Sequence, residues 1–335
     1  MCSVEKSRVP QLRVLVTEKC KSKCIYCRPG GESFCNSHFS ELTPEQIYKA
    51  VSKLSEYGLK AVKISGGEPI LRKDIINIIS LIKTIKTIEH IELITRDPNV
   101  INIIDELEGT GLDCLNFSLD TLDKNKWEVI NGRKGFENLI DVIRKVGKRK
   151  KLNIKINSVM VMNSLREIEE LIEFMSEIGG GTLKLLDLID DITLDYESKR
   201  KFFQSLVSVE EVEDYLSNIS ISKSMTYAPG GLGHPMVTYK ISEKVNVQLK
   251  SNKEGAYYNE KCTLCDNYPC HDAIMALRLT PYGFLQTCLL REDNMLNIRP
   301  YIFDNQNMNK EIYEIFEMYK SSKFYTYKNI CNIKK

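Results

Sequence analysis

The sequence predicts an α/β fold in which parallel strands alternate with helices. Two observations support this: short apolar runs recur through the first half of the chain, and amphipathic stretches separate them. The apolar runs are residues 12–17, 61–65, 90–95, 114–120, 153–161 and 182–189, and the amphipathic stretches are 43–58, 73–85, 99–111, 136–148 and 165–179. Such alternation indicates parallel strands joined by right-handed crossovers. The pattern alone fits both a barrel and a doubly wound sheet, and both place reactive groups at the carboxyl ends of the strands.

The first helical stretch has a clear start signal. In "TPEQIYKAVSKLSEYG" we expect Thr43 to cap the helix, Pro44 to lie in its first turn and Glu45 to complete a capping box. After about residue 195 the pattern changes: 208–219 has a helical pattern, 236–251 alternates like a hairpin, and a cysteine-rich segment follows. We therefore expect a strand–helix core at residues 1–195 and a C-terminal region at residues 196–335 that packs on it.

The composition is that of an ordinary globular protein. The chain has 335 residues, of which 42% are hydrophobic and 27% are charged, and its formal net charge is +2. A charge this small gives no reason to expect a nucleic-acid partner. No apolar run approaches the roughly 20 residues that span a bilayer, and the start "MCSVEKSRVPQLRV" has no apolar signal core. The expected location is the cytoplasm, with no membrane partner.

Eleven cysteines are many for a reducing compartment, and seven of them lie in two groups. That grouping favours metal ligation over a disulfide framework. The first group, Cys20, Cys24 and Cys27, follows the first strand, and its spacing suits zinc or an iron–sulfur cluster. A structural zinc site needs four ligands, whereas three thiolates would hold three irons of a 4Fe–4S cluster and leave the fourth iron open. The alternatives are a zinc knuckle with a remote fourth ligand and three unrelated thiols.

A second motif, "KISGGEP", ends the second strand. Gly66 and Gly67 allow the backbone to approach a ligand closely, and Pro69 fixes the turn that follows. A Gly-Gly turn by itself is weak evidence of a site. Its position on the strand next to the thiol motif predicts that the two motifs form one site.

The Cys-x3-Cys-x2-Cys and Gly-Gly-Glu-Pro motifs together resemble those of the radical S-adenosylmethionine superfamily. The resemblance implies a partial barrel of six strand–helix units, similar to a TIM barrel, in which the open iron binds the methionine part of S-adenosylmethionine. One electron from the cluster then breaks a carbon–sulfur bond, and a 5′-deoxyadenosyl radical takes a hydrogen atom from the substrate. The resemblance therefore implies no catalytic residue beyond the cofactor radical, and an electron donor such as flavodoxin or ferredoxin.

Further blocks resemble the GTP cyclase family of molybdenum-cofactor synthesis. They are "LRVLVTEKCKSKCIYC", "ISGGEPILRKDI", "LNFSLDTLD", "INGRKGFENLIDVI" and "KINSVMVM". In the C-terminal region, Cys262, Cys265 and Cys288 resemble that family's ligands for a second, auxiliary 4Fe–4S cluster. The resemblance also implies S-adenosylmethionine contacts by Tyr26, Gly66, Gly67, Glu68, Pro69, Ser118 and Ile189, where Ile189 replaces the usual Met. It implies substrate contacts by Arg13, Lys63, Lys155 and Arg278, of which Lys63 replaces an Arg.

This chain also departs from the family. Ile94 replaces a Thr that contacts the nucleotide, "TRDPN" at 95–99 replaces a Thr-Asn-Gly turn, and Ala276 replaces one Arg of an Arg-x-Arg pair. The loop between Cys265 and Cys288 is longer and contains Cys270, which could be a fourth ligand of the second cluster or a spectator.

Three functions follow from these observations. We expect radical cyclisation of an anionic, nucleotide-like small molecule, with Arg13, Lys155 and Arg278 meeting one anionic group; GTP itself is one candidate. The alternative enzyme is a peptide-modifying maturase, for which a fully ligated second cluster would suit electron relay. A redox sensor is the third reading, but such a protein has no need of a Gly-Gly-Glu-Pro turn beside an open iron.

Overall fold

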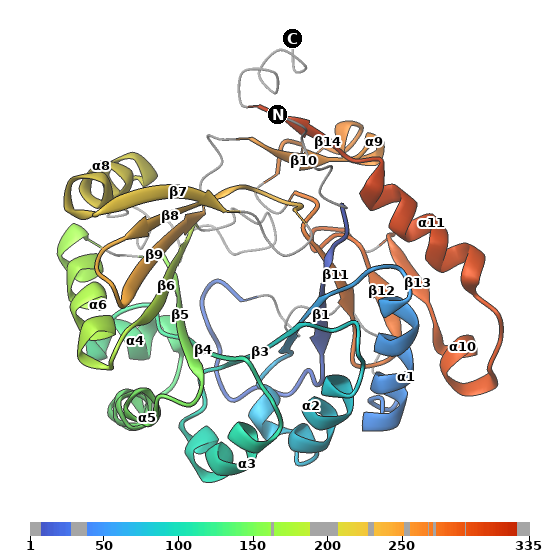
Figure 1. Cartoon of the computed structure of the whole chain (residues 1–335), viewed down its shortest axis with the longest axis horizontal. Helices are drawn as coiled ribbons and strands as arrows, with labels where there is room; N and C mark the ends of the chain where they lie inside the picture. Colours follow the sequence, from blue (N-terminus) through green and yellow to red (C-terminus); the bar gives the residue numbers. More distant parts are fainter. Residues whose placement is uncertain are drawn as a thin grey trace.

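The computed structural model describes residues 8–27, 39–161, 164–187, 207–226, 231–250, 255–266, 268–270, 273–291 and 293–326. Its centre is a curled sheet with helices on the outer face (Figure 1). Six neighbouring strands in this sheet are parallel and follow chain order: β1 Gln11–Leu15, β2 Ala61–Ser65, β3 His90–Thr95, β4 Cys114–Ser118, β5 Asn153–Val159 and β6 Gly181–Leu186. This arrangement confirms the predicted partial barrel and excludes the doubly wound sheet.

The helices between these strands are α1 Pro44–Ser55, α2 Ile75–Lys83, α3 Ile104–Gly109, α4 Lys124–Asn131, α5 Phe136–Arg149 and α6 Leu165–Glu177, with short 3-10 helices η1 Pro69–Leu71 and η2 Pro98–Ile103. Thr43 caps α1 as predicted, but its capping-box partner is Gln46 and not Glu45, because Gln46 is the third helical residue. The predicted stretch 99–111 is divided between η2 and α3. The sequence analysis did not expect α4, which Asp123 caps through the backbone N–H of Lys126.

The alternation of side chains along the strands gives the barrel an apolar outer layer and a polar interior. On β1 the residues on either side of Arg13, Leu12 and Val14, are fully buried beneath the helices. On β2 the same pattern places Lys63 between the buried Val62 and Ile64. Since side chains alternate between the two faces of a strand, the apolar residues pack against the helices, and the basic ones point into the barrel.

The C-terminal region extends this sheet at both edges. Beyond β6 lie β9 Val245–Lys250, which is parallel to it, and then β8 Met236–Lys240 and β7 Ser222–Thr226. Beyond β1 lie the parallel β11 Ala276–Leu279 and the antiparallel β12 Phe284–Gln286 and β13 Met295–Asn297. The predicted hairpin at 236–251 and the helix at 208–219, which is α8 Val209–Ile219, are confirmed. The boundary at residue 195 stays a prediction.

Four of the remaining elements lie around the second group of cysteines. They are β10 Ala256–Tyr258 paired with β14 Lys323–Tyr325, and helices α9 Glu260–Thr263 and α11 Asn309–Lys320, whereas α10 Arg299–Asp304 packs against α1. Figure 1 shows β10 and β14 above one edge of the barrel, with α9 beside them. Across the described ranges, no helix combines the length and the apolar character that crossing a membrane requires.

Candidate active site

A cavity of about 530 Å³ lies at the carboxyl ends of the central strands. Among the predicted site residues, its lining includes Arg13, Cys20, Cys24, Tyr26, Cys27, Gly66, Gly67, Glu68 and Ser118. The structure therefore brings the thiol motif, the Gly-Gly turn and the end of β4 to one place. Pro69 begins η1 beside this cavity. Ile189, the remaining predicted contact for S-adenosylmethionine, lies outside the described residues.

The last turn of α4 holds the thiol loop in position. The backbone N–H groups of Lys23 and Ile25 donate to the carbonyl oxygens of Asn131 and Ile130, each at 2.9 Å. The helix ends at Gly132, which adopts a left-handed conformation with φ of 61°. A Cβ atom at this position would lie 3.0 Å from the carbonyl oxygen of Lys23. The glycine after α4 thus allows the backbone at the end of the helix to lie in contact with the thiol loop.

The Gly-Gly turn packs against the same loop from the other side. The N–H of Gly67 donates to the carbonyl of Thr17 at 2.7 Å, and the N–H of Glu68 donates to the carbonyl of Lys19 at 2.8 Å. A Cβ atom on Gly67 would lie 2.4 Å from the Lys19 oxygen, and one on Gly66 would lie 2.5 Å from the Thr17 oxygen. The two glycines are therefore required for the contact between two segments of backbone, directly before Cys20.

Glu68 is almost fully buried, and its carboxylate already has three hydrogen-bond donors. It accepts from Thr95 Oγ1 at 2.6 Å, from the N–H of Arg96 at 3.0 Å and from the N–H of Ile70 at 3.2 Å. Burial raises the pKa of Glu68, and these hydrogen bonds oppose that shift. The carboxylate therefore fastens the end of β2 to the end of β3.

Arg96 connects the thiol loop to the strand ends. Its guanidinium donates to Cys24 Sγ at 2.9 Å, to Tyr26 Oη at 2.9 Å and to the side-chain oxygen of Asn131. Tyr26 in turn donates to the carboxylate of the buried Asp120 at 2.7 Å. Burial raises the pKa of the Cys24 thiol, and the neighbouring guanidinium opposes that shift. The sequence analysis identified Tyr26 but missed Arg96, Asp120 and Asn131.

The residues of the cavity fit an iron–sulfur cluster with a bound cofactor. The N–H of Ser22 donates to Cys20 Sγ at 3.4 Å, a type of contact that stabilises a thiolate. Ser65 Oγ and Asn157 Oδ1 lie in the cavity wall and find no hydrogen-bond partner in the described part of the chain. A bound molecule or an ordered water would satisfy buried polar atoms of this kind. Over the same described ranges, no group of three or more His, Cys, Asp or Glu side chains is already placed around one metal position.

Below this cavity, a buried carboxylate lies among basic residues inside the barrel. Glu92 on β3 accepts from Asn116 at 2.6 Å and from Lys155 Nζ at 3.0 Å, and Lys63 Nζ lies 3.4 Å away. Burial alone would raise the pKa of Glu92, but the two lysines outweigh it and hold this pKa well below its usual range. Burial lowers the pKa of Lys63, and Lys155 and Arg13 lower it further, while Glu92 opposes the shift.

Positive charge continues around the barrel on both sides of this group. Arg13 is the register neighbour of both Lys63 and Arg278. On the other side, burial lowers the pKa of Lys184 on β6 well below its usual range, and Lys63, Lys155 and Lys250 add to that shift. Arg13, Lys63 and Arg278 are thus neighbours in the sheet, and the convergence of the predicted cations on one anionic group stays a prediction. Lys155 already pairs with the protein's own carboxylate, Glu92.

The second group of cysteines lines a separate cavity of about 710 Å³. Cys262, Cys265, Cys270 and Cys288 all contribute to its wall, so Cys270 lies in the same cavity as the three thiols that resemble ligands. The N–H of Ala273 donates to Cys270 Sγ and the N–H of Leu290 donates to Cys288 Sγ, each at 3.4 Å. The eight described cysteines, these four included, form no disulfide.

Aromatic side chains and one arginine surround the second site. Tyr258 and Tyr268 are buried, and their rings meet edge to face at a centroid distance of 5.0 Å. Asp293 raises the pKa of Arg291, and a hydrogen bond to Cys265 raises it further. Asn259 accepts from the N–H of Cys262 at 2.9 Å and so caps α9, which carries the first thiol of this group.

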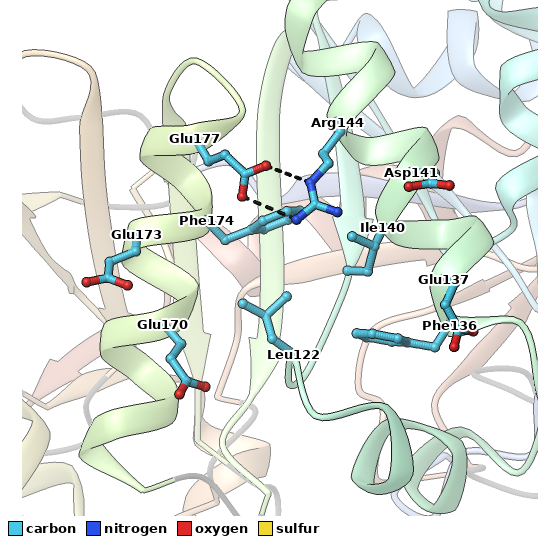
Figure 2. Close-up of a pocket in the computed structure, with 10 residues that line it drawn as sticks. All are labelled: Leu122, Phe136, Glu137, Ile140, Asp141, Arg144, Glu170, Glu173, Phe174 and Glu177. Atoms are coloured by element: carbon cyan, nitrogen blue, oxygen red, sulfur yellow. Dashed lines mark hydrogen bonds and ion pairs between the residues drawn. The ribbon is translucent and has the colours of Figure 1, made fainter.

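A third hollow lies on the outside of the barrel, between α5 and α6 (Figure 2). Its wall contains five carboxylates, and Arg144 joins one of them, Glu177, at 2.6 Å while lying over the ring of Phe174. No residue that the sequence analysis assigned to a site lines this hollow. It is therefore separate from both groups of thiols.

The residues that sequence analysis missed have partial signals in the sequence. Lys184 and Lys250 each interrupt an apolar strand, and strand alternation could have placed them on the same face as Lys155. Arg96 lies in "TRDPN", which was noted only as a departure from a family motif. Glu92 has no signal beyond its place in the apolar run 90–95.

The chain is similar to known proteins in both sequence and fold. The profile described as the Radical SAM superfamily matches residues 14–175. A protein of Pyrococcus horikoshii named "Probable GTP 3′,8-cyclase" is 29% identical over 297 residues, which cover 87% of this chain and 86% of that one. A protein of the same name from Methanocaldococcus jannaschii is 26% identical over 317 residues, which cover 92% and 97% of the two chains.

Solved structures share the fold at low sequence identity. Streptococcus suis SuiB bound to S-adenosylmethionine has a TM-score of 0.55 and 17% identity; the match covers 90% of this chain but only 63% of the SuiB chain. The structure of anSMEcpe with bound AdoMet has a TM-score of 0.54 and 17% identity, with coverage of 93% and 81%. Residues 14–175 therefore form a radical SAM domain, which indicates an enzyme, and the chain is similar over most of its length to proteins named as probable GTP 3′,8-cyclases.

Proposed function

We propose that the protein acts on an anionic, nucleotide-like small molecule and catalyses a radical cyclisation similar to that of its GTP cyclase relatives. Cys20, Cys24 and Cys27 would hold a 4Fe–4S cluster. When bound, this cluster and S-adenosylmethionine supply a 5′-deoxyadenosyl radical that abstracts a hydrogen atom from the substrate. The observation that supports an anionic substrate is the excess of basic over acidic side chains in the barrel interior, directly below the thiol cavity.

The charge balance makes this argument specific. Glu92 is shared by Lys63 and Lys155, and Lys184 is a third amino group close enough for both of these lysines to lower its pKa. Placing several cations together away from water is costly unless an anion joins them. The lowered pKa of Lys184 is a sign of this cost. A phosphate or carboxylate bound there would restore the charge balance.

The chain's own residues would bind and orient the reactants. The Gly66–Gly67 turn and the end of β4 at Ser118 form the wall nearest to the thiols. Ser65 Oγ and Asn157 Oδ1 would offer hydrogen bonds to a bound molecule. The cations of β1, β2, β5 and β11 would hold the anionic end of the substrate deeper in the barrel. The reacting carbon would then face the thiol cavity, away from bulk water.

One observation supports a second candidate, a peptide-modifying enzyme. Cys270 lines the same cavity as Cys262, Cys265 and Cys288, so four thiols are available to a second cluster. A fully ligated cluster has no open iron for a substrate and suits electron relay, which a maturase would use. In the cyclase reading this iron remains open and Cys270 is a spectator. An acidic electron carrier such as flavodoxin or ferredoxin would serve either function.

The decisive experiment is an anaerobic incubation of the reconstituted protein with S-adenosylmethionine, dithionite and deuterium-labelled candidates. One arm contains GTP and other purine nucleotides, and the other contains peptides. Transfer of deuterium from a nucleotide into 5′-deoxyadenosine, measured by mass spectrometry, would support the proposal. Transfer from a peptide alone would favour the maturase. Cleavage of S-adenosylmethionine without transfer from any nucleotide would contradict the nucleotide proposal.

A further inference from the structure

Arg96 occupies an unusual position for a basic residue. It lies at the end of β3, inside the cavity of the first three thiols, where its guanidinium donates to Cys24 Sγ at 2.9 Å. The same group donates to Tyr26 Oη at 2.9 Å and lies over the Tyr26 ring, with 6.0 Å between the guanidinium carbon and the ring centroid. Its backbone N–H is fixed by Glu68 at 3.0 Å. Both ends of the residue are thus anchored.

The partners of Arg96 are themselves held by the fold. Tyr26 donates to Asp120, and the other oxygen of Asp120 accepts from the N–H of Val159 at 3.0 Å. Asn131, which accepts from Arg96, donates through its own amide nitrogen to the carbonyl of Trp127 at 2.8 Å. The guanidinium therefore has a fixed orientation, and one of its N–H groups points at a sulfur atom.

We propose that Arg96 is a positioning residue that holds the Cys24 thiolate by a charged hydrogen bond and thereby raises the reduction potential of the first cluster. This inference rests on the proposed role of Cys24 as a ligand. Reduction adds negative charge to a cluster and its thiolates, and a fixed cation with an N–H directed at one sulfur stabilises that added charge. An arginine at this position would ease reduction of the cluster by its electron donor.

The test compares the reconstituted wild type with Arg96→Gln and Arg96→Lys. Glutamine keeps a hydrogen-bond donor and loses the charge, whereas lysine keeps the charge and loses the forked geometry. Redox titration followed by electron paramagnetic resonance would measure the first cluster, which is identified by the change in its signal when S-adenosylmethionine is added. We expect the ratio of reduced to oxidised cluster in Arg96→Gln to fall about tenfold at a given potential, equivalent to a decrease of about 59 mV for one electron. Arg96→Lys should recover part of this loss.

Arg144→Gln is the matched control, because this arginine joins Glu177 on the outside of the barrel and should leave the potential unchanged. Iron counting and circular dichroism establish that each variant is folded and loaded. Loss of the first cluster alone from both Arg96 variants, with the fold intact, would overturn the proposal by showing that Arg96 serves to retain the cluster rather than to set its potential. An unchanged potential in both loaded Arg96 variants would overturn it. The ligand role of Cys24 is tested separately below, so failure of the two ideas can be distinguished.

Discussion

The two groups of thiols differ in the kind of structure that holds them. The first group lies on the loop that follows β1, and hydrogen bonds to the end of α4 and to the segments directly after β2, β3 and β4 fix this loop. The second group lies among short elements, where α9 has only four residues and β10 and β14 have three each. Around the first site the fixed groups are charged or polar, whereas around the second they include the buried rings of Tyr258 and Tyr268.

This difference indicates a division of labour. A site where chemistry starts needs fixed hydrogen-bond donors and an open cavity, and the first site has Arg96, the Gly-Gly turn and two cavity-facing polar atoms without protein partners in the described chain. A site that binds substrate or relays an electron can tolerate a less rigid frame. The predictions below test this division, from the largest expected effect to the smallest.

The largest effect is expected from Cys24→Ala. Removal of this thiolate should abolish reductive cleavage of S-adenosylmethionine, because the first cluster would lose one of three ligands. The second cluster should persist and should be visible by iron counting and electron paramagnetic resonance. Cys265→Ala is the matched variant at the other site, and it should lose the second cluster but retain cleavage without substrate turnover. Cleavage by Cys24→Ala at the wild-type rate would disprove the ligand assignment.

The next largest effect is expected from Gly67→Ala. The added Cβ would lie 2.4 Å from the backbone oxygen of Lys19, so the thiol loop must shift. A displacement of about 1 Å at a reacting centre can cost on the order of 100-fold in rate, and we expect a loss of that size in the rate of 5′-deoxyadenosine formation. Gly109→Ala is the control, because a Cβ there would meet nothing within 4 Å. Equal activity of the two variants would show that the turn does not position the loop.

How far the sequence alone could predict these sites depends on how local their signals are. Cys20, Cys24 and Cys27 lie within one short motif, and the Gly-Gly turn ends a strand, so both could be identified. Arg96 directly follows β3, Asp120 lies two residues after β4, and Asn131 is the last residue of α4. Only the folded barrel brings these three residues together. Gln46 was missed as a capping partner because the capping-box position lies three residues after the cap Thr43, whereas Glu45 lies only two residues after it. The strands were predicted well because each one carries apolar side chains that pack against the helices on the outside of the barrel, which gives every strand a local signal in the sequence.

Lys184→Met should have a moderate effect: it should weaken substrate binding and make the free protein more stable. Methionine removes an amino group whose charged form is disfavoured first by burial and then by the neighbouring lysines, so the free protein should become more stable, by roughly 2–4 °C in midpoint for each kcal/mol gained. The lost charged contact, worth about 1.5–3 kcal/mol, should weaken binding of an anionic substrate by roughly one to two orders of magnitude. Calorimetry measures both quantities.

The pH dependence of stability offers a second readout for the same variant. The pKa of Lys184 in the folded protein lies below its value in the unfolded chain, because burial disfavours the charged form. At pH values between these two pKa values, Lys184 is protonated in the unfolded chain but not in the folded protein. The free energy of unfolding of the wild type therefore increases with pH in this range. The gain should be absent in Lys184→Met. Lys60→Met, at an exposed ion pair, is the control and should change neither stability nor binding measurably. If Lys184→Met were less stable than the wild type, the proposed cost of burying the charge of Lys184 would be contradicted.

The smallest expected effect, and the one that separates the two enzyme functions, is that of Cys270→Ala. Cys270 lines the same cavity as the other three thiols, and an N–H from Ala273 already points at its sulfur. We therefore expect it to close the fourth iron, so that the alanine variant keeps its iron content but shows an altered signal of the second cluster. Cys114→Ala is the control, because this buried thiol lies on β4 in register with Glu92, outside the walls of both thiol cavities, and should not affect either cluster. An unchanged signal in Cys270→Ala that shifts when a nucleotide is added would show that Cys270 is a spectator. In that case the iron is open to the substrate, and the second site takes part in binding rather than in electron relay.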